Sequence, residues 1–397
     1  MARAVEPGRP AIIPEMAEQA QSLEPAGTGS AATHISQEPV RGGYADRSVL
    51  GFSGLERMRV WIDRRLPAPP IYHLTGLRPV QADADSSTFA MPASPWFRTL
   101  AGVFSSGTLA FLADAPLGSA IAVALPPGQL LVTSDLSMNY LRPASTASGE
   151  LIGRARLIHA GSRLGLSEIL VEDADGRLLA HGTSRCFLFT PISPPPEPPD
   201  PASLPRYAPE FPTPDPYLRP PPGDVVPQEV WDRTSGLEVY RAIIARELPP
   251  PPLHFLTGGR FTEVGEGTAV FVQPSTEWLN SSARAMYGGA IAFVADLALA
   301  GAVHTTLPAG TVFAPLDLKV NFVRPVFADG RDLTARAQVT HRGRSLAVAT
   351  CEVRNADGKQ VAVATGSSVI LADRSWTAER PVVPEDEAEA DEERPGQ

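Results

Sequence analysis

The sequence predicts an α+β fold in which one domain occurs twice in tandem, each copy an antiparallel sheet wrapped around a buried central helix. The first observation behind this prediction is an internal repeat, because shifting the chain by 182 residues brings two halves into register without a gap. Between Gly107–Phe187 and Gly289–Val369, 27 of 81 aligned positions are identical. The second observation is a helix-length apolar segment in each copy, followed by strand-like segments. A helix that is apolar on every face is buried on every face.

Each copy begins with a short amphipathic segment that predicts a helix, GLERMRVWIDRRL from residue 54 and GLEVYRAIIAREL from residue 236. Alternating segments at Thr88–Met91 and Thr268–Val272 then predict strands. The apolar segments that begin at Gly107 and Gly289 predict the two central helices. Each of them is interrupted by one carboxylate, Asp114 in the first copy and Asp296 in the second.

Four strands are predicted after the first central helix, and their counterparts after the second. In the first copy the expected strands are Ser134–Leu141, Leu151–His159, Ser167–Val171 and Leu178–Phe189. In the second copy the alternation is clearest at Asp317–Val323. Strands that follow one buried helix in this way are expected to wrap around it.

The composition along the chain predicts where the two copies begin and end. We expect a disordered N-terminal tail over residues 1–45, domain 1 over 46–190, a linker over 191–228, domain 2 over 229–373 and an acidic disordered tail over 374–397. The linker holds 15 prolines in the 32 positions from Pro191 to Pro222. Such a segment favours the extended polyproline conformation and is expected to act as a semi-rigid strap.

The bulk numbers exclude several classes of function. The formal net charge of −10 argues against nucleic acid as a partner, because phosphate binding needs a basic face. Two cysteines are too few for a disulfide framework or a zinc site, so a reducing compartment and no metal site are expected. No bound cofactor is expected either. No segment reaches the ~18 apolar residues of a membrane span, and the first residues carry no apolar signal core. We therefore expect a soluble cytoplasmic protein without a membrane partner.

The start of each central helix carries the motif that points to a function. Tyr287-Gly288-Gly289 is followed seven residues later by Asp296, and a later strand ends at Arg324-Pro325. The first copy has Ser105-Ser106-Gly107, Asp114 and Arg142-Pro143 at the matching places. Seven residues are about two turns, so the carboxylate lies on the face where the helix begins. Free N–H groups at a helix N-terminus can donate hydrogen bonds to a carbonyl oxygen on which negative charge develops, and a buried carboxylate suits a general base or nucleophile.

This pattern resembles the PaaI-like branch of the hotdog acyl-CoA thioesterases, here as a tandem double hotdog. The resemblance covers residues 65–190 and 247–372 and implies hydrolysis of an acyl- or aryl-acyl-CoA between the two repeats. CoA would enter only as part of the substrate, and double-hotdog units are expected to assemble further into a homo-oligomer. In the family, His precedes the Gly-Gly pair, whereas Tyr287 and Ser105 stand there in this chain. The alternative is therefore a non-catalytic acyl- or acyl-CoA-binding protein.

The resemblance implies that each active site combines the Gly-Gly element of one copy with the carboxylate of the other. The first pairing brings together the second copy's helix start and the first copy's acid, with the residues Gly288, Gly289, Tyr287, Asn280, Asp114 and Thr133. The second pairing joins Asp296 to Ser105, Ser106 and Gly107, with Pro315 in place of the Thr133 hydroxyl. We expect the first pairing to be the better equipped, because it keeps both glycines and the hydroxyl.

Three arginines in turns are candidates for binding the phosphates of CoA, namely Arg163, Arg342 and Arg344, although solvated turn residues are the stronger interpretation. A hydratase of the same fold is disfavoured because the expected His five residues after the acid is missing. Ser119 and Gly301 occupy those two positions.

Overall fold

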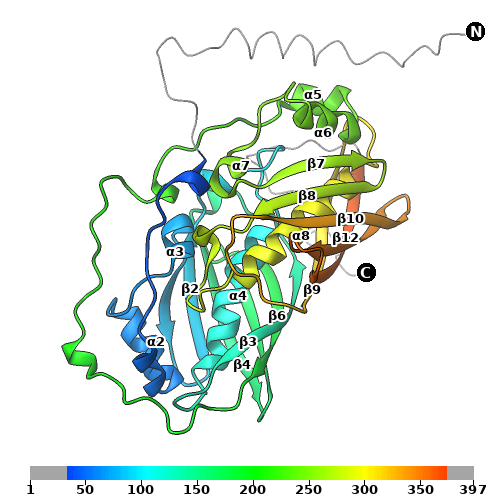
Figure 1. The fold of residues 1–397 in the computed structure, drawn as a ribbon. Coiled ribbons are helices and arrows are strands. Elements are labelled where there is room, and N and C mark those ends of the chain that lie inside the picture. Colours follow the sequence, from blue (N-terminus) through cyan, green and yellow to red (C-terminus); the bar gives the residue numbers. More distant parts are fainter. Residues whose placement is uncertain (1–33, 373–397) are drawn as a thin grey trace, which may run out of the picture.

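The computed structural model describes residues 34–372. Twelve strands in this part of the chain form a single antiparallel sheet in the order β1-β2-β4-β5-β6-β3-β9-β12-β11-β10-β8-β7. The sheet curls around two helices (Figure 1). In domain 1 the strands are β1 Arg78–Ala82, β2 Ser86–Pro92, β3 Leu131–Tyr140, β4 Glu150–Ala160, β5 Leu164–Glu172 and β6 Leu178–Leu188. In domain 2 they are β7 Arg260–Gly265, β8 Thr268–Pro274, β9 Thr311–Phe322, β10 Asp332–Arg342, β11 Leu346–Arg354 and β12 Gln360–Ala372.

The two halves join strand to strand through β3 and β9, as the gapless repeat predicts. Ser137 pairs with Lys319, and these two residues are 182 positions apart, so each is the repeat counterpart of the other. Asp135 pairs with Asn321, and Asn139 pairs with Asp317. These two pairs lie on either side of the Ser137–Lys319 pair, and each is the repeat counterpart of the other. The register therefore places a local two-fold axis between Ser137 and Lys319. The double hotdog is confirmed.

The central helices are α4 Gly107–Ala122 and α8 Gly288–His304, and they begin at or next to the predicted glycines. They pack against each other and against the concave face of the sheet. Their residues are buried almost throughout, as their all-round apolarity predicts. One hydrophobic core contains side chains of both domains, including Phe111 of α4 and Phe293 of α8, whose rings are 6.2 Å apart.

Short helices precede the sheet in each domain: α2 Gly54–Ile62 and α3 Pro70–Thr75 in domain 1, and α5 Gln228–Arg233, α6 Gly236–Ile244 and α7 Pro252–Thr257 in domain 2. The repeated Ser-Gly-Leu-Glu sequence explains where α2 and α6 begin. Ser53 and Glu56 form a capping box at α2, and Ser235 and Glu238 form the same box at α6. The short helices α3 and α7 are absent from the sequence-based prediction; both begin with proline, which is favourable at a first helical turn.

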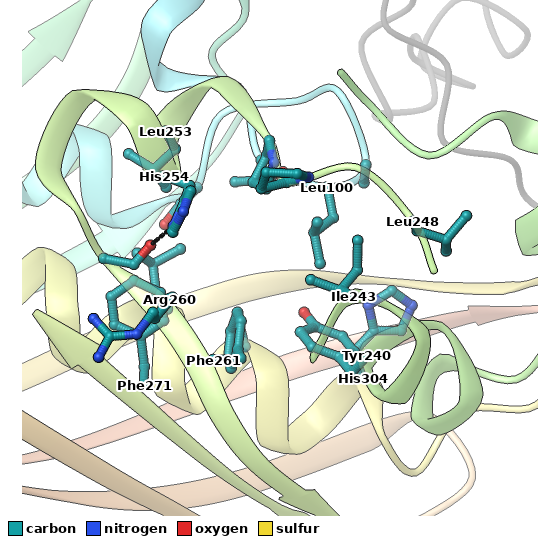
Figure 2. A pocket seen from close by; sticks show the side chains of 18 of the residues that line it. Leu100, Tyr240, Ile243, Leu248, Leu253, His254, Arg260, Phe261, Phe271 and His304 are labelled. Carbon is teal, nitrogen blue, oxygen red and sulfur yellow. Dashed lines mark hydrogen bonds between the residues drawn. The ribbon is translucent and has the colours of Figure 1, made fainter. Parts of the chain in front are cut away.

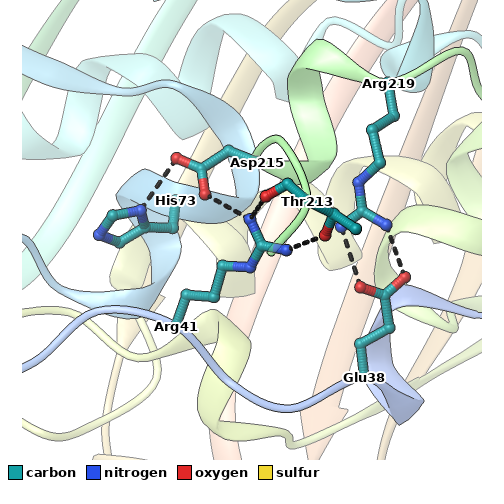
Figure 3. A network of polar contacts seen from close by, with 6 residues as sticks. All are labelled: Glu38, Arg41, His73, Thr213, Asp215 and Arg219. Atoms are coloured by element: carbon teal, nitrogen blue, oxygen red, sulfur yellow. Dashed lines mark hydrogen bonds and ion pairs between the residues drawn. The ribbon is translucent and has the colours of Figure 1, made fainter. Parts of the chain in front are cut away.

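The expectation of disorder is wrong for residues 34–45, since Ile35 is 2% exposed and this segment lies along both domains. The rest of the two predicted tails lies outside the described residues. Figure 3 shows how the segment holds the strap, residues 191–227. Arg41 donates to the Asp215 carboxylate at 3.0 Å, and His73 of α3 contacts the same carboxylate at 2.9 Å. Glu38 binds Arg219 through both of its carboxylate oxygens, at 2.8 and 2.9 Å. The strap is thus fixed along the outer edge of domain 1.

No helix within residues 34–372 has the length and apolarity needed to cross a membrane.

Candidate active site

Each central helix begins against the carboxylate of the other domain. The Gly289 N–H at the start of α8 donates to Asp114 of α4 at 2.9 Å. The Gly107 N–H at the start of α4 donates to Asp296 of α8 at 2.8 Å. The antiparallel packing of α4 against α8 places each acid at the positive end of the partner helix. Both cross-domain pairings that the sequence predicts are therefore present in the structure.

The Asp296 cluster is rich in hydroxyl donors. Besides the Gly107 N–H, the carboxylate accepts hydrogen bonds from the Ser105 hydroxyl and, at 2.9 Å, from the Ser106 hydroxyl. Asp296 is only 4% exposed. Burial raises the pKa of the carboxyl above its usual range, and the three hydrogen bonds offset part of that rise. The two serines thus hold a carboxylate that is hard to ionise in one orientation.

The Asp114 cluster is built differently. Its carboxylate accepts hydrogen bonds from the Thr133 hydroxyl and the Gly289 N–H, both at 2.9 Å. Burial again raises the pKa of this carboxyl. A Cβ atom added at Gly288 would lie 2.7 Å from the nearest Asp114 oxygen. Glycine is therefore required here by the approach of the acid itself.

Tyr287, which the sequence places in this site, directs its hydroxyl into helix α4 instead. The hydroxyl donates to the Phe111 carbonyl and accepts from the Ala115 N–H, each at 2.7 Å. These two backbone groups would bond each other in an unbroken helix, but Pro116 follows Ala115 and disturbs this turn. Tyr287 thus replaces one missing backbone hydrogen bond of α4, a helix of the other domain.

Asn280, the remaining polar candidate of the first pairing, also has another partner. Its side-chain amide donates to the Tyr44 hydroxyl at 3.2 Å, and the two groups that hydrogen-bond the Asp114 carboxylate are Thr133 and Gly289. The first pairing therefore has a carboxylate, one hydroxyl and one backbone donor, with Tyr287 and Asn280 engaged elsewhere.

A cavity of about 1000 Å³ reaches the Asp296 cluster. It lies between α8, the strands β7 and β8, and the helices α6 and α7, and the loop before α4 completes it. Figure 2 shows His254 and Arg260 on one side of this cavity, and Tyr240 and His304 on the other. Ser105, Ser106 and Asp296 all line it, together with Pro315. The second pairing is therefore the one with space for a substrate.

The counterpart of this cavity in domain 1 does not reach the carboxylate of its own copy. A second cavity of about 850 Å³ is lined by Trp61, Tyr72 and neighbouring residues whose repeat counterparts line the first one, but Asp114 is not among them. The rings of Trp61 and Tyr72 stack at 5.4 Å, at the positions of Ile243 and His254. Strap residues 207–217 cover the outer side. The acid of domain 1 is thus separated from the groove that its repeat position would give it.

The arginines proposed for CoA lie away from the cavity. Arg163 and Arg344 are exposed in the turns β4–β5 and β10–β11, and Arg342 contacts Thr306 at 3.3 Å. None of the three lines the cavity, so the structure gives no support to the phosphate role. The cations that do line it are Arg246 and Arg260. Among the residues described, no group of His, Cys, Asp and Glu side chains is arranged to hold a metal ion.

Sequence reasoning missed the aromatic end of the cavity. His304 closes α8 and is 4% exposed, with its ring 4.8 Å from that of Trp231 and nearly parallel to it. Burial lowers the pKa of His304 to about 3, so the imidazole is neutral at physiological pH. A signal was present, because the matching residue of the first copy is Ala122, and a histidine at the end of an otherwise apolar helix departs from the repeat.

Comparison with known proteins gives a consistent result for both copies. The thioesterase superfamily matches residues 101–180 and 284–362. A curated relative, acyl-coenzyme A thioesterase PaaI of Escherichia coli (strain K12), is 35% identical over 103 residues, which are 26% of this chain and 71% of that relative.

Solved structures give further similarities. The tesB protein of Mycobacterium avium subsp. paratuberculosis covers 76% of this chain and 98% of its own, with 14% identity and a TM-score of 0.47. The PaaI protein of E. coli covers 34% of this chain and 94% of its own, with 26% identity and a TM-score of 0.31.

Proposed function

Since the chain belongs to the thioesterase superfamily, we propose that it hydrolyses the thioester of an acyl- or aryl-acyl-CoA, and that this happens at the cluster of Asp296, Ser105, Ser106 and Gly107. One observation carries the choice of site. The large cavity reaches this cluster, whereas Asp114 lines neither that cavity nor its counterpart in domain 1. The proposal therefore reverses the sequence-based expectation that the Asp114 site is the better equipped.

In the proposed reaction Asp296 acts as general base. It takes a proton from a water molecule while the water oxygen attacks the thioester carbonyl carbon. The C–S bond then breaks, the CoA sulfur leaves as a thiolate and takes up a proton, and the free acid is released. The water is split between the two products, so no other reactant is needed.

The neighbours of Asp296 support this role. The hydroxyls of Ser105 and Ser106 hold the carboxylate in place, and burial keeps its pKa raised, which strengthens it as a base. The start of α4 directs its positive helix end towards the cluster, where negative charge develops on the carbonyl oxygen during the reaction. The two hydroxyls stand where the family motif carries His and the first Gly.

The test compares two matched substitutions, Asp296→Asn and Asp114→Asn, which remove the same charge at equivalent positions of the repeat. We expect Asp296→Asn to lower kcat on acyl-CoA substrates by about 10²–10⁴-fold, the usual contribution of a general base. Asp114→Asn should stay within about threefold of the unchanged protein. Thiol release measures the rates, and circular dichroism confirms that both variants fold.

The reverse ranking of the two variants would assign the reaction to the Asp114 site. Saturable binding of acyl-CoA by the unchanged protein without any thiol release would show the non-catalytic binding protein instead.

A further inference from the structure

The cavity beside Asp296 has two chemically different ends. Towards α7 and β7 it is lined by His34, His254 and the exposed Arg260. Towards α5 and α6 it is lined by Trp231, Tyr240, Leu248 and His304, all of them at most 6% exposed. Figure 2 shows Arg260 and Tyr240 on opposite sides. The phosphate groups of a carrier would bind at the cationic end. Burial of an alkyl group is favourable only at the apolar end.

The apolar end is closed by packed elements. The start of α6 abuts the end of α8, and a Cβ atom on Gly236 would lie only 2.1 Å from the His304 carbonyl oxygen. Trp231 of α5 stacks on the His304 ring, and the Tyr240 ring meets that ring edge-on at 5.7 Å. A chain that enters along α8 therefore ends against this group of rings.

These rings are specific to the second copy. The repeat counterparts of Trp231 and His304 are Val49 and Ala122. In both cases the second copy has the larger side chain, and both side chains lie at the same end of the cavity. The second copy is also the one whose carboxylate, Asp296, lines the cavity. Ordinary core packing does not require two larger aromatic side chains that both line the same end of a cavity.

The length of helix α8 gives an estimate of the depth of the apolar end of the cavity. Asp296, Ala300 and His304 lie along one side of α8 and all line the cavity. Eight residues from the carboxylate to the imidazole correspond to about 12 Å of helix. An extended alkyl chain with C–C bonds of ~1.5 Å advances about 1.25 Å per carbon, so this length fits eight to ten carbons, on the order of a medium-length chain.

We propose that Trp231 and His304 form the floor of the acyl-binding end and set the length of the acyl group, so that the preferred substrates are CoA thioesters of medium-length acyl chains. This inference rests on the proposed function, because it takes Asp296 as the point where the thioester carbonyl lies. Ala300, midway between Asp296 and His304 on α8, determines the width of the same channel. The imidazole, being neutral, adds no charge to an apolar floor.

The test measures kcat/KM against a series of straight-chain acyl-CoAs from four to eighteen carbons. The unchanged protein should prefer about eight to ten carbons. His304→Ala, which restores the residue of the first copy, should move the preferred length upwards by roughly two to three carbons. Ala300→Leu should move it downwards, and Gly118→Leu, at the matching position of α4, should leave the profile unchanged.

The same series of non-hydrolysable thioether analogues, followed by the rise in Tm on binding, gives a second readout that needs no turnover. If no acyl-CoA is hydrolysed but the analogues still show the shift in His304→Ala, the floor stands and the proposed reaction fails. If hydrolysis persists and neither His304→Ala nor Ala300→Leu changes the preferred length in either readout, the floor assignment is overturned.

Discussion

Asp114 and Asp296 show how one residue at one position of a repeat acquires two environments. Both accept an N–H from the partner helix, and burial raises the pKa of both. Asp296 is held by two serine hydroxyls and borders the large cavity, while Asp114 has Thr133 and lines neither that cavity nor its counterpart in domain 1. An ionised carboxyl in such surroundings costs stability, and Asp114 is one of the two groups that carry this cost.

This cost gives a pH-dependent prediction for Asp114→Asn. The folded-state pKa of Asp114 is raised, so the contribution of this group to stability is fully present below the unfolded pKa of about 3.9 and is lost as pH rises through the folded pKa. The amide carries no charge and still accepts from the Gly289 N–H. We therefore expect the variant to gain about 1–2 kcal/mol in unfolding free energy at pH 8 and nothing at pH 4.

Urea unfolding at the two pH values measures this gain. A variant that is less stable than the unchanged protein at pH 8 would mean that the hydrogen bonds of the ionised carboxylate outweigh its burial.

The composite acids were predictable because their placement depends only on the repeat and on the helix period. The Gly-to-Asp spacing occurs in both copies. When two such copies pair strand to strand, the start of each central helix lies against the carboxylate of the other copy. The role of Tyr287 was not predictable, because it depends on Pro116 in the other copy, 171 residues earlier in the chain. The choice between the two sites depended on Trp61, Tyr72 and the strap, which only the fold brings together.

At the scale of elements, helix α4 is completed by a side chain from domain 2. The Tyr287 hydroxyl bridges the Phe111 carbonyl and the Ala115 N–H next to Pro116. Tyr287→Phe removes one atom and leaves both backbone groups buried without that partner. We expect it to lower the free energy of unfolding by about 1–3 kcal/mol, the usual cost of unsatisfied buried polar groups.

The matched control for this variant is Tyr240→Phe. Tyr240 is as deeply buried as Tyr287, at 6% and 5% exposed, but within residues 34–372 its hydroxyl makes no hydrogen bond to a backbone group of a helix. Thermal unfolding of the two variants should show a clear loss for Tyr287→Phe and little change for Tyr240→Phe. Equal effects would indicate that the hydroxyl does not hold α4.

At the scale of the whole molecule, the pairing of β3 with β9 makes the two domains one structure. The sheet is continuous across the junction, α4 packs on α8, and the main core contains residues of both halves. Lys319 of β9 adds an ion pair to Asp135 of β3 at 2.8 Å. The strap and residues 34–45 connect the same two halves on the outer side. We therefore expect the two halves to unfold together.

The repeat offers a matched test of this cooperativity. Val171 of β5 and Val353 of β11 are repeat counterparts, both 0% exposed, and both lie away from the β3–β9 junction. Replacing either by alanine should cost about 2 kcal/mol, which lowers the Tm of a protein of this size by about 3 °C. Because the two domains share one core, each variant should move a single calorimetric transition as a whole. Independent domains would behave differently, since Val353→Ala would then lower the transition of domain 2 and leave that of domain 1 in place. Two separated peaks in either variant, or a van't Hoff enthalpy near half of the calorimetric enthalpy, would show that the continuous sheet does not couple the domains.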